Sequence, residues 1–338
     1  MCASAVADGL VQPPHGCHQV AVSQGVFLDL ETVDQGDLDR TALRASLDQW
    51  QWHDFTDVGD IPARVRLADV VVTNKCRLDG SVMDQAPQLG LIALAATGTN
   101  NVDLAAASAR GITVCNIRNY ASAALAQHVI TLMLNLLTAQ PWYWQRVRHG
   151  EWSRARQFCL NDRTIRQARG LNFGVIGYGD LGRASGDLAA SLGMNVLVAE
   201  RKGHAPRAGR LPFEAVVECA DVLSIHCPLS DESCGLIGVD ELRSMKGDAI
   251  LINTARGGIV DEVALAEALR RHQIGGAGID TLTQEPPPVD HVLLAPDIPN
   301  LIVTPHNAWA SQTARQVAMD QVARLIEAFK AGQPINRV

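Results

Sequence analysis

The chain has 338 residues, of which 47% are hydrophobic and 19% are charged, and its net charge is -7 at pH 7. This composition supplies apolar side chains for two domains of ordinary size and excludes a largely disordered chain. The acidic balance argues against binding to nucleic acid or to anionic membranes. The eight cysteines form no CxxC pair, so they predict no metal site and no redox motif, and reduced thiols in a cytoplasmic protein are the simpler expectation.

Two segments bear on targeting. Residues 1–19 contain no Lys or Arg, so they predict a flexible tail rather than a secretory or transit signal. Residues 119–145 contain no charged residue, but Gln127, His128 and Asn135 interrupt the apolar run. A bilayer span needs about 20 mostly apolar residues. We therefore expect a helix buried at the core of a homodimer, and no membrane span.

Short β-rich runs alternate with helical stretches along the whole chain, which is typical of parallel sheets covered by helices on both faces. The expected strands are residues 26–30, 69–73, 91–95 and 112–115, followed by 173–177, 195–198, 221–225, 249–252, 276–279 and 301–303. These two series predict an α/β protein with two doubly wound, Rossmann-like domains.

A helix expected over residues 311–329 does not fit the second sheet, so it is expected to return to the first domain. We predict a discontinuous, flavodoxin-like substrate domain over residues 20–118 and 307–338. A cofactor domain over residues 119–306 is inserted into it. Small ligands commonly bind in the cleft between two such domains.

The most informative local signal is a G-x-G-x-x-G run that follows an expected strand and opens a helix. It consists of Gly177, Tyr178, Gly179, Asp180, Leu181 and Gly182. In this context the glycines allow a tight turn and the helix N-terminus accepts a pyrophosphate. Glu200 ends the next expected strand and is suited to bind the adenosine ribose of NAD. The neighbouring Arg201 and Lys202 keep NADP open as a second cofactor.

Three further segments stand at the carboxyl ends of expected strands, where open α/β sheets bind ligands. They bring Arg256, Glu285 and His306 to one rim. An Arg side chain offers a planar fork to a carboxylate, and a His paired with a carboxylate can protonate a developing alkoxide. Taken singly, each of these residues is more often structural. Together, beside a dinucleotide fingerprint, they predict an active site.

From residue 26 onward the sequence resembles the D-isomer-specific 2-hydroxyacid dehydrogenases, and it looks most like their glycerate dehydrogenase (hydroxypyruvate reductase) branch. The glycine run, residues 253–258, and the spacing of Glu285 and His306 carry the resemblance. It implies that His306 is the acid/base, that Glu285 is its partner and that Arg256 orients the substrate.

The resemblance also implies binding roles for other residues. For the cofactor these are Glu200, Arg201, His226, Cys227, Pro228, Thr254, Ala255 and Asp280, in addition to the glycine run; for the substrate they are Thr97, Gly98, Thr99, Arg256 and Trp309.

The expected reaction is the NAD(P)H-dependent reduction of a small 2-keto acid, hydroxypyruvate or glyoxylate, with no metal. Two alternatives stay open. One is another dehydrogenase of the family, such as a 3-phosphoglycerate dehydrogenase. The other is an NAD-sensing protein that resembles the transcriptional corepressors of this fold.

Overall fold

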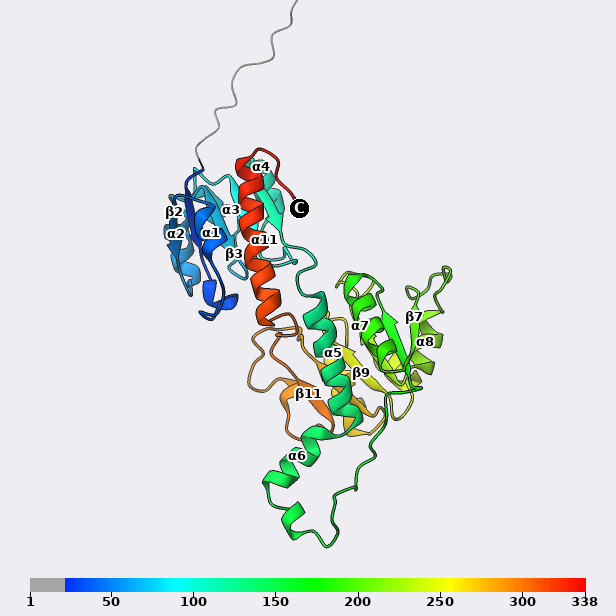
Figure 1. Ribbon diagram of the computed structural model, residues 1–338. Helices are drawn as coiled ribbons and strands as arrows, with labels where there is room; N and C mark the ends of the chain where they lie inside the picture. The colour runs from blue at the N-terminus through cyan, green and yellow to red at the C-terminus, as the bar shows by residue number, and fades with distance from the viewer. Residues whose placement is uncertain (1–21) are drawn as a thin grey trace, which may run out of the picture. The chain divides into compact units, whose positions relative to one another are not determined.

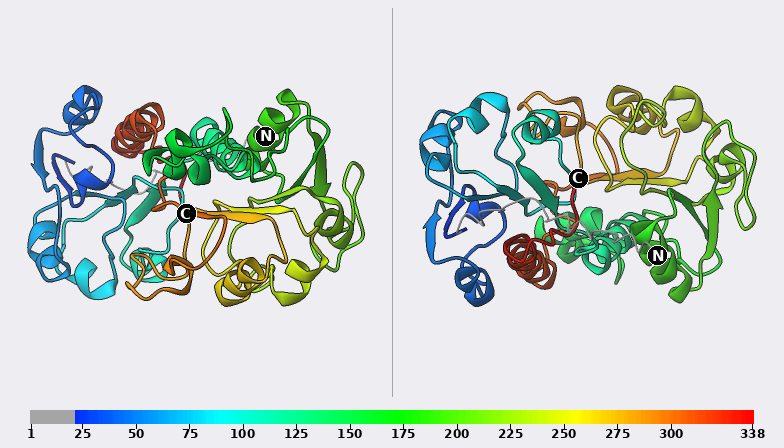
Figure 2. Two further views of the ribbon diagram at one scale, coloured as in Figure 1. Left: turned by 90° about the horizontal axis from the view of Figure 1, so that it is seen from below. Right: turned by 90° about the horizontal axis from the view of Figure 1, so that it is seen from above.

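The computed structural model describes residues 22–338, so the expected tail, residues 1–19, lies outside the described residues. The chain divides into two compact units. Unit 1 holds residues 22–118 and 319–338, and unit 2 holds residues 119–318 (Figure 1). In each unit a parallel sheet carries helices on both of its faces (Figure 2). The expected α/β class with two Rossmann-like sheets is therefore confirmed.

Unit 1 is built on a five-stranded sheet of order β2-β1-β3-β4-β5. Its strands are β1 (Gln24–Phe27), β2 (Gln49–Trp52), β3 (Val70–Thr73), β4 (Leu91–Leu94) and β5 (Thr113–Asn116). Its short helices are α1 (Thr41–Ala45), α2 (Ile61–Val65), α3 (Gly80–Asp84) and α4 (Leu104–Ala109). The strands β3 and β4 are buried on both faces, which explains their unbroken apolar sequences.

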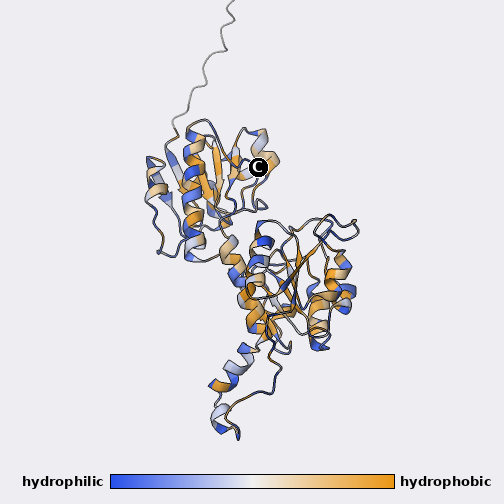
Figure 3. Cartoon of the chain, turned by 45° about the vertical axis from the view of Figure 1, so that its right-hand side comes forward, coloured by the Kyte–Doolittle hydropathy of each residue, from blue (hydrophilic) through white to orange (hydrophobic). Residues whose placement is uncertain are grey.

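Unit 2 is built on a six-stranded sheet of order β11-β10-β9-β8-β6-β7. Its strands are β6 (Asn172–Ile176), β7 (Asn195–Ala199), β8 (Val222–Ile225), β9 (Ile250–Asn253), β10 (Gly276–Ile279) and β11 (Leu301–Val303). Its helices are α5 (Ser122–Leu137), α6 (Gln140–Arg148), α7 (Asp180–Ser191), α8 (Phe213–Cys219), α9 (Val239–Ser244) and α10 (Glu262–Arg270). Most strands of both sheets are coloured as hydrophobic in Figure 3.

The end of the chain returns to unit 1. Helix α11 (Gln312–Lys330) places Lys330 Nζ 2.7 Å from the carbonyl oxygen of Ser46. After this helix, Arg337 forms an antiparallel bridge to Cys115 on β5. The division between the units falls after Ala318, inside α11, and not at residue 307 as the sequence had suggested.

The charge-free segment 119–145 is not one buried helix, so this expectation was wrong. Ala139 adopts a left-handed conformation with φ of 51° and separates α5 from α6 by a bend of 64°. Helix α5 packs into the core of unit 2, whereas α6 buries none of its residues. Within residues 22–338 no single helix is long and apolar enough to cross a membrane; only the bent pair α5 and α6 passes that test together, by length and composition alone.

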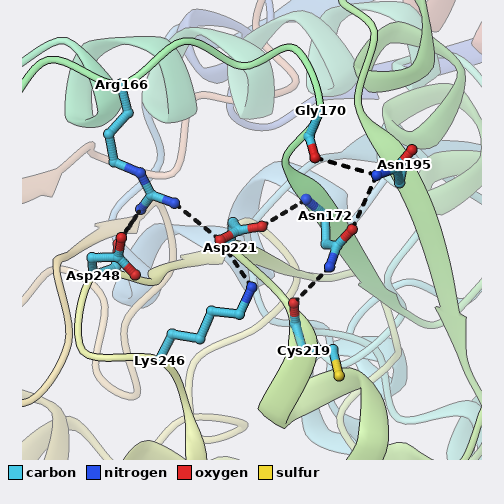
Figure 4. A network of polar contacts seen from close by, with 8 residues as sticks. All are labelled: Arg166, Gly170, Asn172, Asn195, Cys219, Asp221, Lys246 and Asp248. Carbon is cyan, nitrogen blue, oxygen red and sulfur yellow. Dashed lines mark hydrogen bonds and ion pairs between the residues drawn. The ribbon is translucent and has the colours of Figure 1, made fainter.

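A network of hydrogen bonds and ion pairs links the amino ends of strands in unit 2 (Figure 4). Asp221, just before β8, accepts hydrogen bonds from Arg166 Nη2 and Lys246 Nζ, both at 3.0 Å. Its second carboxylate oxygen accepts one from the backbone N–H of Asn172 at 2.8 Å. The opposite, carboxyl ends of the strands are thus left for the loops that carry the candidate site.

Candidate active and cofactor site

The turn between β6 and α7 requires glycine at two positions of the G-x-G-x-x-G run. Gly177 has a φ of 88°, which L side chains rarely adopt. A Cβ atom on Gly182 would lie 2.1 Å from the carbonyl oxygen of Gly177. The run therefore forms the tight turn expected of it, and α7 begins at Asp180 with its N-terminus at this turn.

A cavity of about 580 Å³ opens beside this turn, a size within the range of small-molecule and cofactor sites. It brings together many of the predicted cofactor residues. Those in its lining are Gly177, Tyr178, Gly179, Glu200, Arg201, His226, Cys227 and Pro228. Asp180, Leu181 and Gly182 follow the turn in α7 but are not in the lining, and Thr254, Ala255 and Asp280 lie at the ends of other strands.

Two partly exposed residues of the lining have pKa values that are shifted by the protein packed around them. Burial lowers the pKa of His226 to about 4, so its ring is neutral at neutral pH. Its Nε2 atom lies 2.9 Å from Ser224 Oγ. Burial also raises the pKa of the Cys227 thiol, which makes this cysteine an unreactive wall of the cavity near neutral pH.

His306 and Glu285 form a direct pair, with His306 Nδ1 2.6 Å from Glu285 Oε2. The other carboxylate oxygen, Glu285 Oε1, accepts a hydrogen bond from the backbone N–H of Leu282 at 2.9 Å. Both side chains remain about one-third exposed, at 29% for His306 and 34% for Glu285. The pair is thus fixed in orientation and open to a small ligand.

The backbone of His306 is held in an unusual conformation. Its φ is 52°, a left-handed value that costs energy for a residue with a side chain and that often marks functional sites. Its N–H donates to the carbonyl oxygen of Asp280 at 2.9 Å, and its own carbonyl oxygen accepts from Trp309 Nε1 at 2.9 Å. These contacts fix the direction of the imidazole ring.

Asp280 is an anchor for this loop. Its Oδ1 accepts from Thr304 Oγ1 at 2.6 Å and from the backbone N–H of Asn307 at 3.0 Å, and its Oδ2 accepts from Ala308 N at 3.1 Å. His128 on α5 joins the group, because its Nε2 lies 3.0 Å from Thr304 Oγ1. Only 1% of the Asp280 side chain is exposed, so its carboxylate serves here to hold the loop.

Arg256 lies in the loop after β9. Asn253 shapes this turn by donating to the carbonyl oxygen of Arg256 at 2.9 Å and accepting from Ala255 N at 3.0 Å. The exposed guanidinium of Arg256 contacts only the carbonyl oxygen of Ala255, and it forms no ion pair within the described part of the chain. In the same loop, buried Thr254 Oγ1 has no hydrogen-bond partner among the described residues. Neither side chain is therefore committed to an ion pair or to a hydrogen bond with the side chain of another described residue.

Tyr120 belongs to this region, although sequence reasoning did not single it out. Its ring meets that of Trp309 edge to face, with centroids 6.2 Å apart. Burial raises the pKa of Tyr120 to about 12, while the charge of Arg256 opposes the shift. Trp309 and Tyr120 thus form an aromatic pair beside the loop of His306, and no periodicity or motif in the sequence indicates this contact.

The predicted substrate loop lies in unit 1, directly after β4. Asn116 Nδ2 donates to the carbonyl oxygen of Thr97 at 2.7 Å, and the carbonyl oxygen of Thr99 accepts from Val102 N at 3.0 Å. The backbone N–H groups of Thr97, Gly98 and Thr99 donate no hydrogen bond to other described residues. Free N–H groups in succession are suited to an anion.

Comparisons with known proteins agree with this geometry. Residues 130–308 match the family described as D-isomer specific 2-hydroxyacid dehydrogenase, NAD binding domain. The chain is 44% identical to the glycerate dehydrogenase of Methylorubrum extorquens over 89% of this chain and 97% of that protein. It is 32% identical to the hydroxypyruvate reductase of Blautia hydrogenotrophica over 93% of this chain and 98% of that protein.

Solved structures show the same fold. A protein from Thermus thermophilus superposes with a TM-score of 0.81 at 32% identity, covering 93% of this chain and 99% of its own. The NADPH-dependent glyoxylate/hydroxypyruvate reductase of Sinorhizobium meliloti, solved with NADP and malonate, gives a TM-score of 0.76 at 26% identity, covering 94% of this chain and 97% of its own.

The fold and the glycine turn define an NAD-binding oxidoreductase. The chain belongs to the D-isomer specific 2-hydroxyacid dehydrogenases, and it catalyses NAD(P)H-dependent reduction of 2-keto acids. The residues present fit this cofactor. A Cβ at Gly182 would clash with the backbone of the turn, and a Cβ at Gly179 would meet no atom within 4 Å, so there is open space beside the backbone of Gly179.

Proposed function

We propose that this enzyme reduces hydroxypyruvate, and glyoxylate as a second substrate, to the corresponding 2-hydroxy acids, D-glycerate and glycolate. The names of its relatives support the substrate class: a glycerate dehydrogenase at 44% identity and a hydroxypyruvate reductase at 32%. The observation that carries the chemistry is the contact of 2.6 Å between His306 Nδ1 and Glu285 Oε2.

The proposed reaction needs a hydride at C2 and a proton at the carbonyl oxygen. NAD(P)H supplies the hydride when it is bound. Because Glu285 occupies Nδ1 of His306, the ring presents Nε2 to the substrate, and this nitrogen donates the proton. The negative charge of Glu285 stabilises the protonated ring until the proton is transferred.

The substrate carboxylate requires donors that no protein group already uses. Arg256 meets this requirement because its guanidinium lacks an ion pair among the described residues. We assign it to the carboxylate and the developing alkoxide. We propose that residues 97–99 bind substrate through their free backbone N–H groups. We assign Thr254, Ala255 and Asp280 to the nicotinamide end of the cofactor. Trp309 is proposed as a wall of the substrate pocket.

A direct test is to follow NADH oxidation with hydroxypyruvate, glyoxylate, pyruvate, 2-ketobutyrate and 3-phosphohydroxypyruvate side by side, and then to repeat the series with NADPH. We expect the highest kcat/KM for hydroxypyruvate. A preference for the phosphorylated acid would instead identify a 3-phosphoglycerate dehydrogenase. Tight NADH binding without turnover of any keto acid would favour an NAD sensor.

The enzyme is also proposed to form a homodimer. Trp142 and Trp144 on α6 are 40% and 60% exposed, and Trp152 beyond it is 52% exposed. Large apolar side chains gathered on one exposed segment are typical of an interaction surface. Light scattering of the protein in solution tests this proposal. The cytoplasmic location expected from the cysteines stays a prediction.

A further inference from the structure

The cavity beside the glycine turn is unusually rich in cationic side chains at one end. Arg201, Lys202, Arg207 and Arg210 line it, against two acidic side chains, Glu200 and Glu232. This end follows β7, the position at which dinucleotide-binding domains contact the adenosine ribose. Whether a ribose hydroxyl or a ribose phosphate binds there depends on which of these charges are already paired.

Glu200 is already paired. Its Oε2 accepts from Arg207 Nε at 2.6 Å, and its Oε1 accepts from Arg207 Nη2 at 2.5 Å and from the backbone N–H of Arg201 at 2.9 Å. Arg210 Nη1 stands a further 3.6 Å from Oε1. Only 2% of the Glu200 side chain is exposed, whereas 61% of the Arg207 side chain is exposed.

The pairing with Arg207 prevents Glu200 from selecting NAD over NADP. An acid that selects NAD must offer free carboxylate oxygens to the ribose hydroxyls and an unbalanced charge that repels a 2′-phosphate. A carboxylate has about four acceptor positions. The three donors named above and the backbone N–H of Arg207, 3.3 Å from Glu200 Oε2, occupy them. The charge of Glu200 is balanced by Arg207, so neither condition holds.

The remaining cations differ in availability. Lys202 Nζ is 2.6 Å from Glu241 Oε1, so its charge is paired with a residue that does not line the cavity. The guanidinium of Arg201 has no partner among residues 22–338. Arg201 is therefore the available donor for a phosphate at this end of the cavity.

We propose that Arg207 is a specificity-determining residue: by neutralising Glu200, it allows the 2′-phosphate of NADP to bind beside Arg201. This inference rests on the proposed function only for the placement of the adenosine ribose in this cavity. It predicts an enzyme that accepts NADPH even though an acid, Glu200, directly follows β7. The sequence alone favoured NAD because of Glu200 and kept NADP possible because of Arg201 and Lys202. Arg207 was not considered there, because it stands seven residues from Glu200 and no motif links the two.

The test compares two nucleotides that differ only in the relevant phosphate, so it needs no turnover. Adenosine 5′-monophosphate and adenosine 2′,5′-bisphosphate are titrated calorimetrically into the wild type, Arg207→Gln, Glu200→Gln and the double variant. Arg243→Gln serves as a matched control, because Arg243 is an exposed arginine on α9 outside the cavity lining. Thermal unfolding confirms that each variant is folded.

The wild type is expected to bind the bisphosphate at least as tightly as the monophosphate. Arg207→Gln should weaken binding of the bisphosphate about tenfold or more, because it exposes the charge of Glu200, and it should not weaken binding of the monophosphate. The double variant should regain most of the lost affinity. Glu200→Gln alone should change the ratio of the two affinities by less than about twofold, since its charge is already balanced.

Two results would overturn the proposal. The first is an unchanged affinity ratio in Arg207→Gln. The second, which applies even if that variant fails to fold, is a rise of about tenfold in bisphosphate affinity in Glu200→Gln, because it would show that Glu200 still repels the phosphate. Failure of the wild type to bind either nucleotide or NADH would instead refute the cofactor site itself.

Discussion

Glu285 holds His306 Nδ1 with one carboxylate oxygen at 2.6 Å and the backbone N–H of Leu282 with the other at 2.9 Å. The acid therefore fixes both the position and the orientation of the ring. Replacing Glu285 with Gln keeps the size of the side chain but removes its charge. We expect kcat to fall about 100-fold and the affinity for NADH to stay unchanged, which steady-state kinetics and fluorescence titration measure. A kcat near that of the wild type would show that Glu285 has no role in the reaction.

Arg256 is expected to act through its planar fork and not through its charge alone. Arg256→Lys keeps the charge but removes the bidentate geometry, so KM for the keto acid should rise about tenfold and kcat should fall as well. Binding of NADH should not change. Arg243→Lys is the matched control, because Arg243 is a surface arginine that is 70% exposed. Equal KM values in the two variants would contradict the assignment of Arg256 to the substrate.

Two substitutions in the glycine turn should affect folding and cofactor binding differently. A Cβ on Gly182 would lie 2.1 Å from the carbonyl oxygen of Gly177, so Gly182→Ala should lower the melting temperature. A Cβ on Gly179 would meet nothing within 4 Å, so Gly179→Ala should fold normally. It should nevertheless weaken NADH binding about tenfold, because the pyrophosphate must approach this backbone closely. Normal NADH affinity in Gly179→Ala would place the cofactor elsewhere.

Much of the fold follows from sequence patterns, because strands buried on both faces are continuous apolar runs. The expected segments 91–95 and 276–279 correspond to β4 and β10. The strand expected over residues 26–30 is shorter, since β1 ends at Phe27 and a 3-10 helix begins at Leu30. The edge strand β2 was missed. It is half exposed, and only the alternation of Trp50 and Trp52 in it signals a strand.

The candidate site, like the fold, was only partly predictable from the sequence. The turn at residues 177–182 has a local spacing that identifies it from sequence. Pairings that no motif links have no such signal: Arg207 reaches Glu200 from seven residues further along the loop after β7, and Tyr120 meets Trp309 across 189 positions. The break between α5 and α6 did have a signal, because Pro141 lies in the first turn of α6, a position that proline favours.

The ring of His226, which the surrounding protein largely shields from water, predicts acid sensitivity. Its pKa is lowered to about 4 by burial, whereas an unfolded chain binds this proton near pH 6.5, so unfolding takes up a proton between these values. The free energy of unfolding should therefore fall by about 2 kcal/mol from pH 7.5 to pH 5 through this group alone. Urea denaturation across that range should show a flatter dependence in His226→Gln. The same slope as the wild type would contradict this account.

The network of Asp221 predicts a structural effect far from the chemistry. Burial raises the pKa of Asp221, but the backbone N–H of Asn172 and the charge of Lys246 outweigh it, so the net pKa is lowered. Asp221→Asn should reduce the free energy of unfolding by about 2 kcal/mol, as expected when hydrogen bonds to a charged group are lost. Asp248→Asn, whose side chain is 64% exposed, should change it by less than about 0.5 kcal/mol. Equal effects of the two substitutions would contradict the anchoring role.

The central claim is that His306 donates the proton to the reduced carbonyl. Asn tolerates the left-handed backbone that His306 adopts, so His306→Asn removes the acid and keeps the loop. The most direct measurement is stopped-flow oxidation of NADH by saturating hydroxypyruvate in this variant, with NADH affinity measured in parallel. The account predicts a rate lower by about 100-fold to 10,000-fold with unchanged NADH affinity. A rate within about threefold of the wild type would contradict it.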